Sequence, residues 1–241
     1  MRFCHFITFE RAGAAPPAAE LAGLSAVLAA TPGLDHALLH LPASAHDPYL
    51  HDGASPALAL QLYFAEIAAL EAALAPDGRL QALADPALLP SLRGATVTQQ
   101  AMLVRRFPVP EPDSGVAEEA AQCTYLVSYQ GAAEDLDAWL AHYTAEHPPI
   151  MARFPGIRQI EITPRLDWLG SLPFARVAYM QRNKVVFDSP AALTAALASP
   201  VRDEMRADFH RFPPFTGPTT HFPMLTRPML RRGVGLPGGG R

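Results

Sequence analysis

The chain has 241 residues, of which 49% are hydrophobic and 17% charged, with a net charge of −4 at pH 7. This balance is typical of a globular protein with a sizeable core, and it excludes a disordered chain. It also argues against a nucleic-acid partner, because phosphate binding needs a basic face. The two cysteines are too few for a disulfide framework or a cysteine zinc site, so a reducing compartment is expected. Without a signal-peptide pattern or a run of about 20 apolar residues, the sequence predicts a cytoplasmic protein and no membrane partner.

The first predicted unit, residues 1–107, has the order strand, helix, strand, strand, helix, strand. Apolar alternation predicts strands at 2–10, 34–41, 57–64 and 96–107. Helices are expected at 18–30 and around "AALEAALA" at residues 68–75. A Pro-Gly pair at Pro32 ends the first helix and leads into the second strand.

Residues 108–122 carry prolines, a Ser-Gly pair and an acidic run, which are typical of a linker. The second unit, residues 123–230, repeats the order of the first. Its strands are expected at 123–130, 157–163, 175–187 and 218–226, and its first helix at 133–147. The second helix begins with Asp188 or Ser189 as its N-cap and Pro190 at its first position. Residues 231–241 are expected to form a flexible tail.

The two units share more than their order of elements. "AALEAALA" returns as "AALTAALA" at residues 191–198, an offset of 123 residues (191 − 68). The same offset relates the Pro-Gly pairs at Pro32 and Pro155 (155 − 32). Met102 and Met224, near the ends of the units, are 122 residues apart (224 − 102). Several landmarks in one order, at nearly constant spacing, predict a tandem duplication of a unit of roughly 110 residues.

The order β-α-β-β-α-β predicts a ferredoxin-like unit, with both helices on one face of an antiparallel sheet. The strands are apolar on both faces, as in the alternation of Leu126 and Val127, so the other face also needs cover. The sheet of the second unit can provide it. We therefore predict an α+β fold in which two fused units form an intramolecular α+β barrel around an apolar space. Closing it needs no second chain, so a monomer and a homodimer are both open.

The second unit resembles a known family. "LDAWLAHYTAEHPPIMARFPGI", then "FDSPAALTAALASP", then an Asp-Phe segment are similar to the EthD family of dimeric α+β barrel proteins. The resemblance covers about residues 123–224 and implies the barrel fold. The wider superfamily includes monooxygenases, lactone isomerases and haem enzymes, and some relatives resemble dehydratases or decarboxylases. The resemblance therefore leaves the reaction open, and with it whether the protein is an enzyme at all.

His147 is the main candidate for acid/base catalysis. An imidazole titrates near neutral pH, the two following prolines fix its backbone, and the position 123 residues earlier holds Leu24. The alternative is a histidine that only interacts with the end of its helix. Tyr143, four residues earlier on the same face, is expected to donate a hydrogen bond to substrate, or else to pack in the core. Asp208 is expected to pair with a histidine across the barrel mouth, or else to be a surface carboxylate.

Four further residues are predicted to bind substrate, with core packing as the alternative for the aromatic ones: Tyr129, Trp139, Tyr179 and His221. His142 is expected to face solvent. The stretch "HDPYLHD" at residues 46–52 has two His-Asp pairs, which fit either a metal site or a polar loop. No metal is assigned, and the cofactor is unknown, with none implied by the sequence; haem is left open.

These features predict a protein that binds a small apolar or aromatic molecule in a barrel cavity. The chemistry expected there is cofactor-free dehydration or isomerisation through His147, of lyase, isomerase or monooxygenase-like type. The alternative is a non-catalytic binding or accessory protein of a catabolic or biosynthetic pathway. A filled interior would instead indicate a structural role.

Overall fold

A computed structural model describes residues 2–11, 15–112 and 121–232. The first half of the chain contains β1 (Phe3–Glu10), α1 (Ala18–Ala29), β2 (Leu34–Pro42), β3 (Leu58–Phe64), α2 (Ile67–Leu74), the 3₁₀ turns η1 (Arg79–Ala84) and η2 (Pro90–Leu92), β4 (Thr96–Leu103) and β5 (Arg105–Phe107). The second half contains β6 (Gln122–Tyr129), α3 (Leu136–Met151), β7 (Ile157–Pro164), β8 (Ala175–Arg176), β9 (Gln181–Phe187), α4 (Pro190–Leu197), α5 (Val201–Phe209) and β10 (Thr219–Arg231). The expected linker and tail lie partly outside the described residues.

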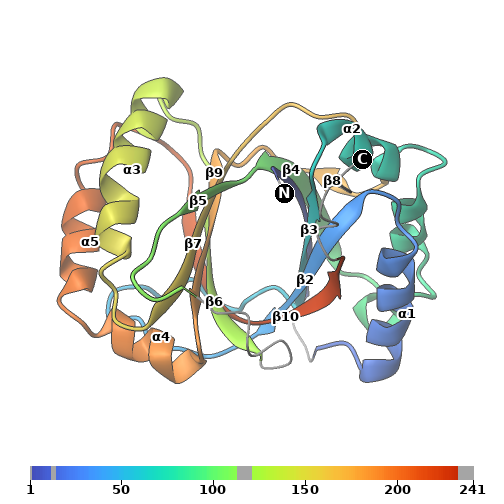
Figure 1. The fold of residues 1–241 in the computed structure, drawn as a ribbon, viewed down its shortest axis with the longest axis horizontal. Helices are drawn as coiled ribbons and strands as arrows, with labels where there is room; N and C mark the ends of the chain where they lie inside the picture. The colour runs from blue at the N-terminus through green and yellow to red at the C-terminus, as the bar shows by residue number, and fades with distance from the viewer. Residues whose placement is uncertain (1, 12–14, 113–120, 233–241) are drawn as a thin grey trace, which may run out of the picture.

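The described strands form one curved sheet in the order β5-β7-β9-β6-β10-β2-β3-β1-β4-β8. Within it, β4-β1-β3-β2 and β10-β6-β9-β7 have the same antiparallel order, which is that of a ferredoxin-like unit. The units join where β10 pairs with β2, and β5 of the first half pairs with β7 of the second. Helices α3, α4 and α5 cover one outer side of the barrel and α1 and α2 the opposite side (Figure 1). The predicted α+β fold class, with two ferredoxin-like units forming a barrel within one chain, is confirmed.

Several elements differ from their predicted bounds. The strand predicted at 96–107 is divided into β4 and β5, β10 continues past residue 226 to Arg231, and α5 was not predicted. Helix α3 continues through Pro148 and Pro149 to Met151. Each proline removes one N–H from the helix, but the last turn still closes, because the Ala152 N–H donates to the Pro148 carbonyl at 2.8 Å. The strand predicted at 175–187 is divided, because β8 leaves its own unit and pairs with β4 of the other. At α4, the N-cap is Ser189, whose hydroxyl accepts the Ala192 N–H.

The space enclosed by the curved sheet is only in part the apolar enclosure that was predicted. An apolar cluster lies in it, formed by Cys4, Phe6, Leu38, Ala59, Tyr63, Met102, Leu126 and Met224. The space also contains a buried network in which Glu161 accepts hydrogen bonds from Tyr63 Oη at 2.6 Å and Gln61 Nε2 at 2.8 Å. Lys184 Nζ donates to Tyr63 Oη at 2.7 Å and lies 3.7 Å from Glu161. The network joins the halves, since Tyr63 and Gln61 come from the first and the charged pair from the second. Mutual pairing makes these charges tolerable between the sheets.

At one end, the inter-sheet space opens into a cavity of about 1060 Å³, lined by both apolar and charged residues. Its cations already have partners in the fold. Besides Lys184, Arg106 lies 3.5 Å from Glu161, and Arg158 binds Asp188 and Glu111. No helix in the part of the chain that the structure describes has the length and apolar character to cross a bilayer.

Candidate functional site

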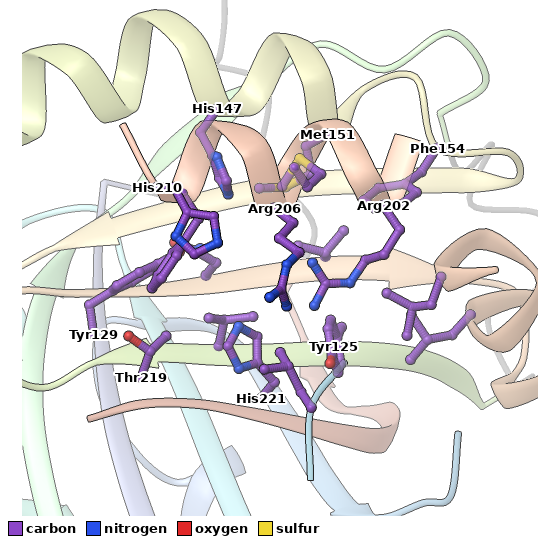
Figure 2. A pocket seen from close by; sticks show the side chains of 18 of the residues that line it. Tyr125, Tyr129, His147, Met151, Phe154, Arg202, Arg206, His210, Thr219 and His221 are labelled. Atoms are coloured by element: carbon purple, nitrogen blue, oxygen red, sulfur yellow. The ribbon is translucent and has the colours of Figure 1, made fainter. Parts of the chain in front are cut away.

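A cavity of about 540 Å³ lies in the second half, between the outer face of its sheet and helices α3, α4 and α5 (Figure 2). Its walls are mostly apolar and aromatic, with contributions from Val127, Tyr129, Met151, Val185, Phe187 and Phe215. A volume of this size suits a small-molecule ligand. The sequence predicted a cavity between the sheets, whereas this one lies between sheet and helices. His147 points into it (Figure 2).

Regular spacing brings the lining side chains together. Alternation along β6 turns Tyr125, Val127 and Tyr129 toward the helices, while the residues between them face the other sheet. On α5, Arg202, Met205, Arg206 and Phe209 follow the i, i+3, i+4, i+7 pattern of one helical face, and all line the cavity. On α3, His147 and Met151 lie one turn apart on the same face.

His147 and Asp208 form a buried pair. His147 Nδ1 lies 2.7 Å from Asp208 Oδ2, and their side chains are 6% and 0% exposed. Arg211 donates to the other carboxylate oxygen at 2.8 Å, and His142 Nε2 lies 3.3 Å from that oxygen. His142 therefore contacts the buried acid rather than facing solvent as predicted. The carboxylate favours the tautomer with the proton on Nδ1, which leaves Nε2 of His147 as a proton acceptor.

The surroundings keep this histidine neutral near pH 7. Burial lowers the pKa of His147 below its ordinary value of 6.5, although Asp208 opposes the shift. Burial alone would raise the pKa of Asp208, but the hydrogen bonds from His147 and Arg211 outweigh it and hold that pKa below 3.8. A neutral imidazole oriented by an ionised carboxylate is the arrangement of a general base.

An aromatic layer supports His147 from behind. Tyr143 is fully buried and does not line the cavity, because its ring stacks on Trp139 at 5.0 Å and lies 4.8 Å from His147. Asn183 Nδ2 donates to the Tyr143 hydroxyl at 2.5 Å. Trp139 is also fully buried behind the wall. Tyr143 and Trp139, which were predicted to contact substrate or else to pack in the core, do not line the cavity and instead pack the histidine's helix against the sheet.

The other three residues predicted to bind substrate do not all lie at the cavity. Tyr129 and His221 both line the cavity. His221 Nδ1 lies 2.9 Å from Asp52 Oδ2, and this hydrogen bond, against the opposing effect of burial, lowers the pKa of Asp52. Tyr179 lies elsewhere, in the segment that precedes β9. Its ring is 4.8 Å from the guanidinium of Arg182, which is in β9. Tyr179 does not line this cavity, because the segment that precedes β9 crosses to the first half.

The loop at 43–57 was not expected at the site. It leaves the first half and reaches the cavity, where Leu50 forms part of the wall. Asp47 accepts from Tyr125 Oη at 2.8 Å and lies 3.0 Å from Arg202. The aspartates of the loop's two His-Asp pairs, Asp47 and Asp52, thus bind side chains of the second half. Among the described residues, no group of three or more His, Cys, Asp or Glu side chains could hold a metal.

The cationic residues on α5 were also missed as site residues. Arg202, Arg206 and His210 line the cavity, and Arg206 and His210 are also exposed to solvent. The available signal was the four-residue spacing of the two arginines before Asp208.

No protein-family model and no curated protein matches the chain. Among solved structures, an anthrone oxidase-like protein aligns over 98% of this chain and 97% of its own, with a TM-score of 0.62 and 12% identity. A proposed monooxygenase from Fusobacterium nucleatum aligns over 93% and 91%, with a TM-score of 0.51 and 6% identity. An EthD family protein from Bacillus halodurans is 21% identical over 41% of this chain and 96% of its own, but its TM-score is 0.33. At these identities the first two show a shared fold and nothing about the reaction, and the third score is too low to support an argument.

Proposed function

We propose that the protein binds a small apolar or aromatic molecule in the helix–sheet cavity and transfers a proton on it, with His147 as the general base. One observation carries the proposal: an imidazole bonded to a buried carboxylate at 2.7 Å points into a largely apolar cavity of about 540 Å³. Proton transfer from a C–H to a neutral imidazole creates an imidazolium, and the buried Asp208 carboxylate is placed to stabilise it.

The chemistry follows from the two ring nitrogens. His147 Nε2 takes a proton from an activated carbon, and the Nδ1–H bond to Asp208 stabilises the imidazolium that forms. Returning the proton to another carbon completes an isomerisation, and returning it to a departing hydroxyl completes a dehydration that releases water. Neither outcome consumes a cofactor.

Anthrone is a suitable probe, because its C10 methylene is acidified by two aromatic rings and a conjugated carbonyl. One of the structural neighbours is also named as anthrone oxidase-like. Under anaerobic conditions in deuterated buffer, we expect the protein to accelerate hydrogen–deuterium exchange at C10, as measured by mass spectrometry. His147→Gln should reduce the protein-dependent rate by about 100-fold or more. His46→Gln, the same change at an exposed histidine, should leave it unaltered. Equal exchange in wild type and His147→Gln would contradict the proposal.

A second candidate is binding without catalysis, as an accessory protein. It is favoured by the polar residues of the wall, several of which are already bonded within the protein: Tyr125 to Asp47, Asn183 to Tyr143, and His221 to Asp52. Anthrone binding without accelerated exchange would support this reading.

We further propose that the two halves, residues 1–107 and 123–230, derive from one duplicated EthD-like unit. Helices α2 and α4 begin 123 residues apart (190 − 67). The Pro-Gly turns that precede β2 and β7 both have their glycine at φ 72°, at Gly33 and Gly156.

Both cysteines are free and buried, which fits the proposed cytoplasmic setting. Because a single chain closes the barrel, the fold is compatible with both a monomer and a homodimer.

A further inference from the structure

The charge of the cavity wall is one-sided. Among the described residues that line it there are two arginines, Arg202 and Arg206, and no aspartate or glutamate. Three histidines, His147, His210 and His221, also line it. A cavity with low-polarity walls and only positive formal charge attracts an anion more strongly than a surface arginine would.

The two arginines are not equivalent. Arg202 is neutralised by Asp47, whose carboxylate lies 3.0 Å from its guanidinium. Arg206, one helical turn later, has no carboxylate within salt-bridge distance among residues 2–11, 15–112 and 121–232. Its guanidinium lies 4.7 Å from the centre of the Tyr49 ring and reaches into the cavity beside that of Arg202 (Figure 2).

Tyr49 fixes the position of this charge from the outside. Its hydroxyl donates to Asp203 on the solvent side of α5, and 42% of the tyrosine is exposed. Its ring is closer to the Arg206 guanidinium, at 4.7 Å, than to that of Arg202, at 5.4 Å. Cation–π contact leaves the N–H groups at the edge of the guanidinium available. These groups form the planar fork that pairs with a carboxylate.

We infer that the ligand of this cavity is an aromatic or alicyclic carboxylate, with its acid group bound by Arg206 at the opening and its ring in the apolar interior. The inference rests on the proposed function for the identity of the site, and it adds the class of ligand. It also orients the ligand, because an acid held at the opening directs the carbon skeleton toward His147.

Binding of a matched pair of ligands tests this inference. 2-Naphthoate and 2-naphthamide have the same shape and differ in charge, and isothermal titration calorimetry measures both. We expect wild type to prefer the naphthoate by about tenfold, the effect of one charge-assisted hydrogen-bonded pair. Arg206→Gln should abolish the preference while leaving naphthamide affinity unchanged. Arg153 lies outside the cavity and forms a salt bridge with Glu204, so Arg153→Gln removes the same charge and should retain the preference.

Salt supplies a second measurement without any substitution. Because the opening is in contact with solvent, the preference should shrink as sodium chloride rises from 20 mM to about 500 mM. Equal affinity for the two ligands in wild type, or a preference that survives Arg206→Gln, would overturn the inference. Tighter binding of 2-naphthyl phosphate than of the naphthoate would overturn the choice of a carboxylate. These outcomes test only the class of ligand, whereas anthrone that binds without accelerated exchange would count against His147 as the base.

Discussion

The two halves have the same strand order but differ in the layer between sheet and helices. In the first half this layer is filled by leucines in and next to the two 3₁₀ turns, Leu80, Leu83, Leu89 and Leu92, together with Trp168 and Leu172. In the second half the same layer encloses the cavity of about 540 Å³. One scaffold therefore supports a solid core on one side and a binding site on the other.

The halves also exchange equivalent loops. The segment between β2 and β3, at 43–57, covers the second half's cavity, and the segment between β7 and β9, at 165–180, packs on the first half. The second loop inserts Trp168 deeply, with its ring 5.0 Å from that of His5 and only 8% of the residue exposed. The first loop contributes only Leu50 to the wall. Its other contacts with the second half include the packing of Ala45 against the core and the hydrogen bonds of Asp47 and Asp52. Whether the crossing loop fills the layer or merely covers it thus distinguishes a core from a cavity.

The largest expected effect comes from removing the filling residue. Trp168→Ala should destabilise the protein by about 3–5 kcal/mol, because it leaves a large void in a packed layer. Leu50→Ala, on the equivalent loop of the other half, should cost only about 1 kcal/mol, because that side chain is partly exposed beside an existing cavity. Urea unfolding followed by circular dichroism compares the two. Similar losses would show that the two loops do not play the different roles described.

The buried network between the halves provides the next test. Glu161→Gln should destabilise by about 3 kcal/mol, because Lys184 then remains buried without a counter-charge. Adding Lys184→Met should restore most of the loss. If the double variant is no more stable than Glu161→Gln, the charges do not act as a pair, and urea midpoints of the three proteins decide this.

The sequence predicts the fold well, because the determining signals are local. The Pro-Gly pairs ended the first helices, alternation marked the strands, and repeated spacing indicated two units of one kind. The position of the cavity is a different matter. Leu126 and Val127 show that both faces of β6 are covered, but not which covered face retains a space. That depends on Trp168 and Leu50, which reach their positions by crossing between halves.

The site was predictable only in part for the same reason. His147 was identified mainly by its place in the motif that resembles the EthD family. The contrast with Leu24, which is fully buried in the first half's core, supported the choice. Helical spacing placed Tyr143 on the same face as His147, but it says nothing of depth, and the tyrosine lies behind the wall. The contact of His147 with Asp208 joins residues 61 positions apart through the packing of α3 on α5, which no local pattern encodes.

Histidines distinguish the halves again and give a pH test. Burial lowers the pKa of His5 and of His40 to about 3, whereas His147 has a carboxylate partner that opposes such a shift. Below pH 6.5, His5 and His40 are therefore protonated in the unfolded chain but remain neutral in the folded protein. Their contribution to the free energy of unfolding should be fully present above pH 6.5. As the pH drops below that value, the free energy should fall by about 1.4 kcal/mol per pH unit for each histidine. His40→Gln should remove about one such contribution between pH 6 and 5. An unchanged slope of unfolding free energy against pH would contradict the assignment.

The smallest effect concerns the carboxylate that distinguishes His147 from the histidines of the first half. Asp208 raises the pKa of His147 against burial, so Asp208→Asn should lower that pKa further. Ring-proton shifts in an NMR titration measure it, with the His147 signal assigned by its absence in His147→Gln. Asp137→Asn, at an exposed position on α3, should leave the titration in place. A rise in the pKa of His147 in Asp208→Asn would mean that the carboxylate does not stabilise the imidazolium. His147 would then be buried in the same way as His5, and the chemical difference between the halves would reduce to an empty space.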